Sequence, residues 1–122
     1  MREFIQSKLE EIEDLEVTAE NSDDILEDGK TYFSFTLYKN YQDSDLNKNY
    51  TYNQSLIGFI KRLEKPTENT LAIIDSMQDK IETKLKEINI KTSFQDVSVN
   101  NGIRKTRCIG ECLYNEINYE IV

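Results

Sequence analysis

Asp43, Asp45 and Asn47 come closest to a metal site, because their types and spacing imitate the start of a calcium-binding loop. Such a loop also needs a glycine at its sixth position and a bidentate glutamate at its twelfth. Lys48 and Gln54 stand at those two positions, so the pattern fails. We expect an Asx-rich turn between strands here, without bound calcium.

Other catalytic constellations are excluded by residue type. The chain has no histidine, which rules out Ser-His-Asp and Cys-His arrangements and removes the usual zinc ligand. None of its four glycines lies in a phosphate-binding pattern. Paired carboxylates such as Asp23-Asp24 would need a dry pocket to act as acid and base, and an acidic loop open to water provides the opposite. We expect no enzymatic activity, no metal and no cofactor.

The thiols indicate a reducing compartment. Cys108 and Cys112 are the only cysteines, and on one strand they would lie roughly 13 Å apart on the same face. That separation is too long for a disulfide. We expect two reduced, partly buried thiols in a protein that is made and kept in the cytoplasm unless it leaves inside a larger assembly. No apolar run approaches the length of a membrane span, and the amino terminus lacks a secretory pattern.

The net charge of −8 resides in the first quarter of the chain. Residues 1–30 contain eleven acids and three bases, whereas the other 92 residues contain twelve of each sign. Without a basic cluster, specific binding of DNA or RNA is not expected. Two interpretations of the acidic stretch remain open. It is either a solvated helix face followed by a solvated loop, or a surface that meets a basic partner or repels a polyanion.

Hydrophobic periodicity predicts the elements that would position any site. A helical stripe runs over residues 3–15, and an irregular, turn-rich connection follows over residues 16–30. Strands are predicted over residues 31–39 and 50–63, with an exposed loop at 40–49. A long helix with an unbroken stripe is predicted over residues 70–88, with Thr67 as a plausible N-cap before it.

Two further strands complete the pattern, over residues 89–99 and from 103 to 121. Asn101-Gly102 is typical of the type I′ turn that joins two antiparallel strands. A bulge or a twist is predicted between Phe94 and Val97, where the apolar alternation shifts. The fold class is therefore α+β, with the order α-β-β-α-β-β, in a single domain over residues 1–122. One antiparallel sheet would carry the long helix on one face, with the short N-terminal helix beside it.

Tyrosines crowd the first predicted hairpin, and tyrosine is enriched at protein contacts. We expect part of this group to pack across strands and the rest to form a subunit interface. Its members are Tyr32, Tyr38, Tyr41, Tyr50 and Tyr52.

In size and element order the chain resembles the tail-terminator family of long-tailed bacteriophages, also called tail-completion or head–tail joining proteins. The resemblance rests on the opening helix at 2–15, the sheet split around the long helix at 70–88, and the final strand pair at 90–122, which is closed by Asn101-Gly102. It implies a hexameric ring in the virion that caps the tail tube and joins it to the head-connector protein. It also implies that DNA passes through the ring without specific binding.

An acidic lumen would suit such a ring, because attraction to phosphates would slow the DNA. Six acidic residues are candidates for this lumen or for a partner surface: Asp23, Asp24, Glu27, Asp28, Asp43 and Asp45. Two alternatives remain open from the residues. One is a monomeric acidic inhibitor, of the immunity-protein or antitoxin type, that uses residues 10–28 to cover a basic active site. The other is a different neck or baseplate component of the same kind of virion.

Overall fold

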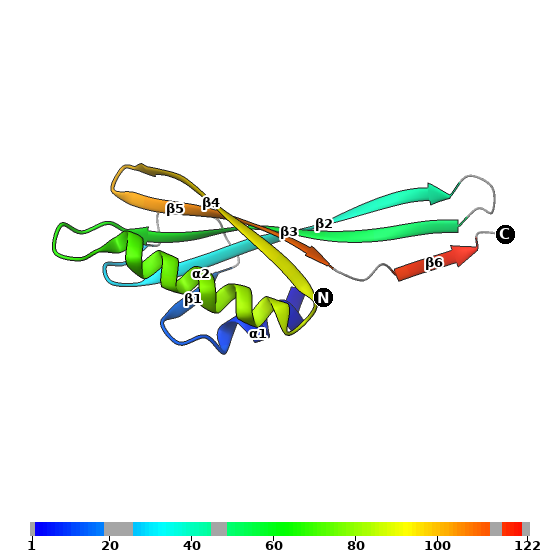
Figure 1. Ribbon diagram of the computed structural model, residues 1–122, viewed down its shortest axis with the longest axis horizontal. Helices are drawn as coiled ribbons and strands as arrows, with labels where there is room; N and C mark the ends of the chain where they lie inside the picture. The colour runs from blue at the N-terminus through cyan, green and yellow to red at the C-terminus, as the bar shows by residue number, and fades with distance from the viewer. Residues whose placement is uncertain (1, 19–25, 45–48, 113–115, 121–122) are drawn as a thin grey trace.

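The computed structural model describes residues 2–18, 26–44, 49–112 and 116–120 (Figure 1). Two helices and six strands confirm the α+β class. In chain order they are α1 (Arg2–Glu10), β1 (Leu15–Thr18), β2 (Thr31–Ser44), β3 (Asn49–Leu63), α2 (Thr70–Lys86), β4 (Ile90–Asn100), β5 (Ile103–Cys112) and β6 (Glu116–Glu120).

All six strands join one sheet in the order β1-β2-β3-β5-β4, and β6 pairs with β3 beyond the end of β5. The sheet is mixed, not antiparallel as expected, because β1 runs parallel to β2. Residues 19–30 separate these two strands, which is the length of connection that a parallel pair requires. The pairing places Leu15 beside Thr31 and Val17 beside Phe33, so that the apolar side chains of β1 join the core.

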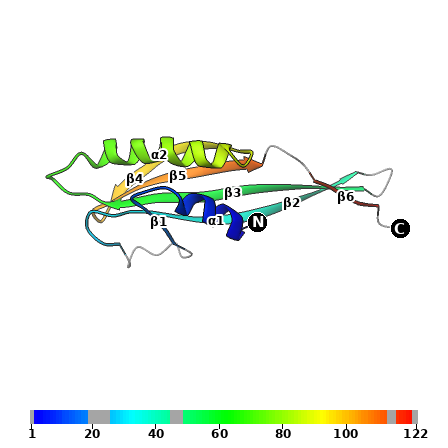
Figure 2. The ribbon, with the colours of Figure 1, turned by 90° about the horizontal axis from the view of Figure 1, so that it is seen from below.

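Both helices contribute to a single core on one face of the sheet. Figure 2 shows α2 running along this face, and α1 packs against α2 and β1. The predicted stripe of the first helix is confirmed, since Ile5, Leu9, Ile12 and Leu15 are all buried. An ion pair of 3.0 Å between Lys8 Nζ and Glu87 Oε2 ties α1 to the end of α2.

Several element boundaries differ from the predicted ones. The helix α1 ends at Glu10, because the chain then turns and Asp14 adopts a left-handed φ of 65°. The helix α2 begins at Thr70, and its N-cap is Asn69, whose side chain accepts a hydrogen bond from the backbone N–H of Ala72 at 3.2 Å. Leu71 is 40% exposed, so the buried stripe of α2 starts one turn later than expected.

The predicted hairpin between β4 and β5 is confirmed. Asn101 and Gly102 both have positive φ, 54° and 76°, as a type I′ turn requires. The predicted bulge is also present, because the register of β4 on β5 shifts between Asp96 and Ser98. The last predicted strand is divided, with β5 ending at Cys112 and β6 following it.

The loop predicted at 40–49 is wrong for most of its length. The strand β2 continues to Ser44 and β3 begins at Asn49, in an unbroken antiparallel register. Figures 1 and 2 show that these strand ends, together with β6, extend well beyond the part of the sheet that the helices cover. We call this projection the arm, and define it as residues 39–44, 49–54 and 116–120.

Candidate interaction surfaces

The arm is the most prominent candidate surface. It consists of three strands in the order β2-β3-β6, and no helix among the described residues covers either of its faces (Figure 2). The six residues of β2 in the arm span about 20 Å at the usual rise of a strand. A strand ribbon of this size buries little apolar surface alone, so it gains stability from whatever packs on it.

The outer edge of β2 offers a second surface. The strand β1 covers this edge only from Thr31 to Ser34. Next to it, Arg2 Nη1 donates a hydrogen bond of 2.8 Å to the carbonyl oxygen of Phe35, and its guanidinium lies 4.5 Å from the Phe35 ring centroid. From Thr36 to Ser44 no strand in the described part of the chain pairs with this edge. An edge of this kind can accept a strand from another chain.

Of the candidate interface tyrosines, Tyr32 and Tyr38 have described side chains, and these two do not share one exposed surface. Tyr32 is 8% exposed, and its hydroxyl accepts a hydrogen bond of 3.0 Å from the backbone N–H of Glu27, so it serves a contact within the chain. Tyr38 is 47% exposed near the base of the arm. Tyr41 and Tyr52 are opposite each other on β2 and β3, and Tyr50 lies opposite Asp43. The side chains of these last three tyrosines fall outside the described residues.

Among the six candidate acidic residues, Glu27 and Asp28 have described side chains. Glu27 Oε2 pairs with Lys30 Nζ at 2.9 Å, and Asp28 Oδ2 pairs with Lys65 Nζ at 3.4 Å. The hydrogen bond that Lys30 donates to Glu27 raises the pKa of Lys30 above its usual value. Both carboxylates therefore have partners in their own chain.

The remaining four candidates are described in part or not at all. Asp43 has a described backbone only, and it lies within the β2 ladder of the arm. Asp23, Asp24 and Asp45 lie outside the described residues.

An acidic turn between α1 and β1 lies within residues 10–28, the range that the inhibitor alternative assigns to a partner surface without distinguishing its members. We define the acidic turn as residues 10–16. It carries five exposed carboxylates: Glu10, Glu11, Glu13, Asp14 and Glu16. The buried side chains of Ile12 and Leu15 hold it against the core. The signal was present in the sequence, because apolar anchors alternate with acids there.

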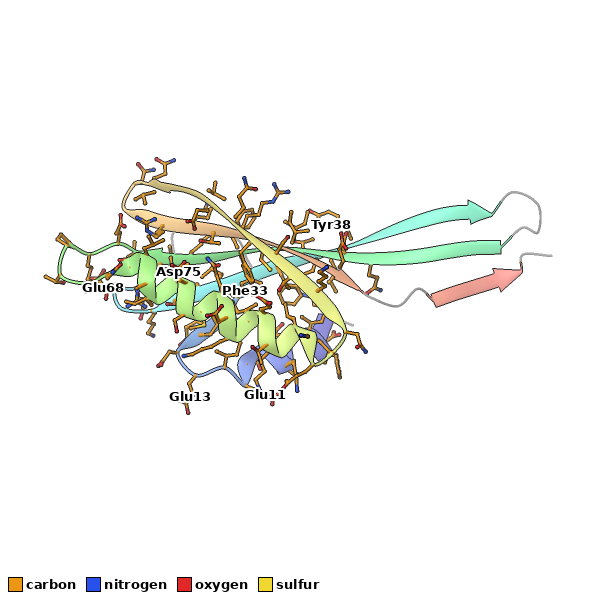
Figure 3. All side chains as sticks on the ribbon, in the orientation of Figure 1. Glu11, Glu13, Phe33, Tyr38, Glu68 and Asp75 are labelled. Atoms are coloured by element: carbon orange, nitrogen blue, oxygen red, sulfur yellow. The ribbon has the colours of Figure 1, made fainter. Side chains whose placement is uncertain are left out.

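Only part of this charge is neutralised within the chain. Glu11 lies 3.7 Å from Lys8 Nζ and 3.6 Å from Lys84 Nζ. Glu13 and Asp14 make no ion pair or hydrogen bond in the described part of the structure. Figure 3 shows the Glu11 and Glu13 side chains pointing away from the body.

A charged cluster around Arg62 has a structural role. Arg62 is 8% exposed. Its Nε and Nη2 donate hydrogen bonds of 3.0 and 3.1 Å to the two carboxylate oxygens of Glu68. Its third nitrogen donates to Thr31 Oγ1 at 2.9 Å. The hydrogen bonds from Arg62 hold the pKa of Glu68 below its usual value. This fork connects the end of β3 to the turn before α2 and to the start of β2, which satisfies the charge of a buried guanidinium.

The described residues present neither a reactive thiol nor a metal-binding cluster. Cys108 is fully buried, and burial raises the pKa of its thiol to about 12, which leaves the sulfur unreactive. Within the described ranges, no three carboxylate or cysteine side chains gather as a metal site would require. Neither described helix is long and apolar enough to cross a membrane.

The surfaces of this protein are therefore strand edges, an uncovered arm and a charged turn. Comparison with known proteins adds no family to this description: no family model matches the chain, and no curated protein matches its sequence.

Proposed function

We propose that this protein is a structural component of a long-tailed bacteriophage virion, a tail terminator. In this role it forms a hexameric ring that caps the tail tube and joins it to the head-connector protein, and DNA passes through the ring without specific binding. The protein is not an enzyme and needs no cofactor.

The arm is the observation that carries the proposal. An arm of three strands without a covering helix is better suited to pack on a neighbour than to stand in water. The unpaired edge of β2 from Thr36 to Ser44 supports the same conclusion, since exposed strand edges are normally protected in monomers. In a head-to-tail ring, each copy uses two different surfaces, and an arm and a body provide two such surfaces.

A shortened arm tests this proposal directly. Lys39 and Gln54 lie opposite each other in the β2–β3 ladder, so replacing residues 40–53 by Asn-Gly closes the hairpin with a two-residue turn. We expect the full chain to form rings that are visible by electron microscopy, whereas the shortened chain remains a monomer that unfolds cooperatively in urea. If the full chain stays monomeric at every concentration, the ring proposal is wrong. If the shortened chain forms the same rings, the arm is not the assembly element.

The lumen hypothesis has its own test. Within the proposed ring, Glu27 and Asp28 are acidic candidates for the lumen, and we expect their replacement by lysine in the virion to slow DNA ejection. Lys30 and Lys65 pair with these carboxylates. The variants Lys30→Glu and Lys65→Glu break the same ion pairs without adding positive charge, so they control for a folding defect. Normal ejection kinetics in the Glu27→Lys, Asp28→Lys virion would refute the hypothesis.

One observation favours a second candidate function. The unpaired carboxylates of the acidic turn would also suit a monomeric inhibitor that covers a basic active site, as an immunity protein or antitoxin does. This candidate requires a strict monomer that binds a basic nuclease tightly.

A role as a different neck or baseplate component would retain the arm and the assembly but change the partner protein. Portal, connector and tail-tube genes beside this one would favour the virion roles.

A further inference from the structure

The face of the sheet opposite the helices has an unusual composition for a protein of this charge. Alternation along the strands places Ile57, Phe59 and Lys61 of β3 on this face, opposite Ile109, Arg107 and Lys105 of β5. We call it the open face. Its centre combines partly exposed apolar side chains with cations, a mixture that is typical of protein interfaces.

Positive charge dominates this face, although the chain as a whole is acidic. Lys91, Lys105 and Arg107 face this side, whereas Lys61 is buried beneath it. The described carboxylates that face the same way are Glu111, opposite Lys91, and Glu16 at the far edge on β1, beside Tyr32. Asp96 does not offset these cations, because its carboxylate accepts a hydrogen bond from Thr106 on the helix-covered face.

Arg107 is the residue most in need of an acceptor. It lies between Phe59 and Gln95 on neighbouring strands. Its Nε is buried and has no hydrogen-bond partner in the described part of the chain. Beside it, Lys105 Nζ lies 5.7 Å from the Phe59 ring centroid. A guanidinium that is partly desolvated and incompletely paired is destabilising alone and favourable once a carboxylate reaches it.

We propose that the open face of one copy binds the acidic turn of a second copy, with the carboxylates of Glu13 and Asp14 directed at Arg107. This inference rests on the proposed ring and adds a second contact between neighbours to the one that the arm makes. Glu13 and Asp14 are the exposed acids of the turn that lack partners of their own, and Ile12 anchors the turn in the core. The contact therefore joins two preformed, oppositely charged surfaces and needs little reorganisation.

The two surfaces lie on different sides of the body. The acidic turn lies at the β1 side of the body, where Glu13 points outward, whereas the open face lies opposite α2 (Figures 2 and 3). An edge of one copy thus meets a face of the next. When such a contact repeats head to tail, it closes into a ring or continues as a filament, as the proposed ring requires. Packing two open faces together would instead set Lys105 and Arg107 against the same cations of the partner.

A charge-swap cycle on the full chain tests the contact, with self-association measured by sedimentation velocity over a concentration series. We expect Arg107→Glu and Glu13→Lys each to weaken association at least tenfold at low salt, and the double variant to recover most of the loss. Arg107→Gln, which adds no carboxylate to the sheet, is expected to weaken association less than Arg107→Glu. Lys86→Glu and Asp75→Lys make matched charge changes at exposed positions on α2 and should leave association unchanged.

Each outcome decides between distinct conclusions. If Arg107→Glu folds and assembles like the unmodified chain, this contact is wrong and the proposed ring stands. If both single variants fail and the double variant does not recover, the two residues do not meet and the contact is again wrong. If duplex DNA binds the unmodified chain but not Arg107→Gln, the open face is a nucleic-acid surface and the inference is overturned. If the unmodified chain never associates, the proposed function itself fails.

Discussion

Gly58 provides the sharpest quantitative prediction, because it lies at the centre of β3 with strands on both sides. A methyl group added there would lie 2.6 Å from Cζ of Phe33 and 2.9 Å from the carbonyl oxygen of Ser34. Phe33 is fully buried, so its ring cannot swing into solvent. Overpacking of this kind costs about 1–3 kcal/mol, and the stiffer unfolded chain returns about 0.4–1 kcal/mol. We expect Gly58→Ala to lower the free energy of unfolding by about 1–2 kcal/mol.

Gly110 is the matched control on the neighbouring strand. A methyl group at Gly110 would meet Ile90 Cγ2 at 3.0 Å and Leu56 Cβ at 3.2 Å, and these looser contacts need smaller shifts of the neighbours than those at Gly58. We expect Gly110→Ala to stay within about 1 kcal/mol of the unmodified protein. Urea unfolding at low protein concentration measures both variants, and heating should lower the Tm of Gly58→Ala by about 4–8 °C. Equal stabilities for the two variants, or a larger loss at Gly110, would refute the packing described around Phe33.

Three more predictions concern single side chains. Asn69→Ala should remove the α2 cap and cost about 1 kcal/mol in urea unfolding, whereas Thr67→Ala should change little; the reverse order would contradict the cap. The hydrogen bonds from Arg62 lower the folded pKa of Glu68 from its usual 4.5, so the stability they contribute is present above that pH and is lost as the pH falls through the lowered pKa. Glu68→Gln should therefore lose less stability on acidification than the unmodified protein, and equal slopes would contradict the fork. Cys108 should resist thiol reagents at pH 8 until the protein unfolds, as peptide mapping can verify; rapid native labelling would contradict its burial.

The parts of the fold that follow local rules were predictable from the sequence. The apolar residues Ile5, Leu9, Ile12 and Leu15 recur at helical spacing, and all four are buried although the helix ends at Glu10. Hydrophobic periodicity therefore identified the side of the segment that faces the core, but not the residue at which the helix ends. Asn101-Gly102 specifies its turn because both residues accept positive φ. The stripe of α2 identified its buried side, from Ile74 to Leu85, for the same reason.

The parts decided by distant partners were not predictable. Leu15 to Thr18 is too short a run to be recognised as a strand, and its parallel pairing with β2 depends on how residues 19–30 return. Residues 40–44 are polar and typical of a loop, yet β3 pairs with them to the end of the ladder. Charge counts identified an acidic region, but could not indicate that Glu27 and Asp28 are paired while Glu13 and Asp14 are not.

The central claim is that this protein acts through assembly of its surfaces and not through a pocket. The most direct test is the mass of the purified full chain under native conditions over a range of concentrations. A closed hexamer has a mass of about 86 kDa, which is six times the 14.3 kDa of the chain. The account predicts that this discrete species accumulates as concentration rises, and that filaments of indefinite length do not form. A strict 14.3 kDa monomer at every concentration would contradict it.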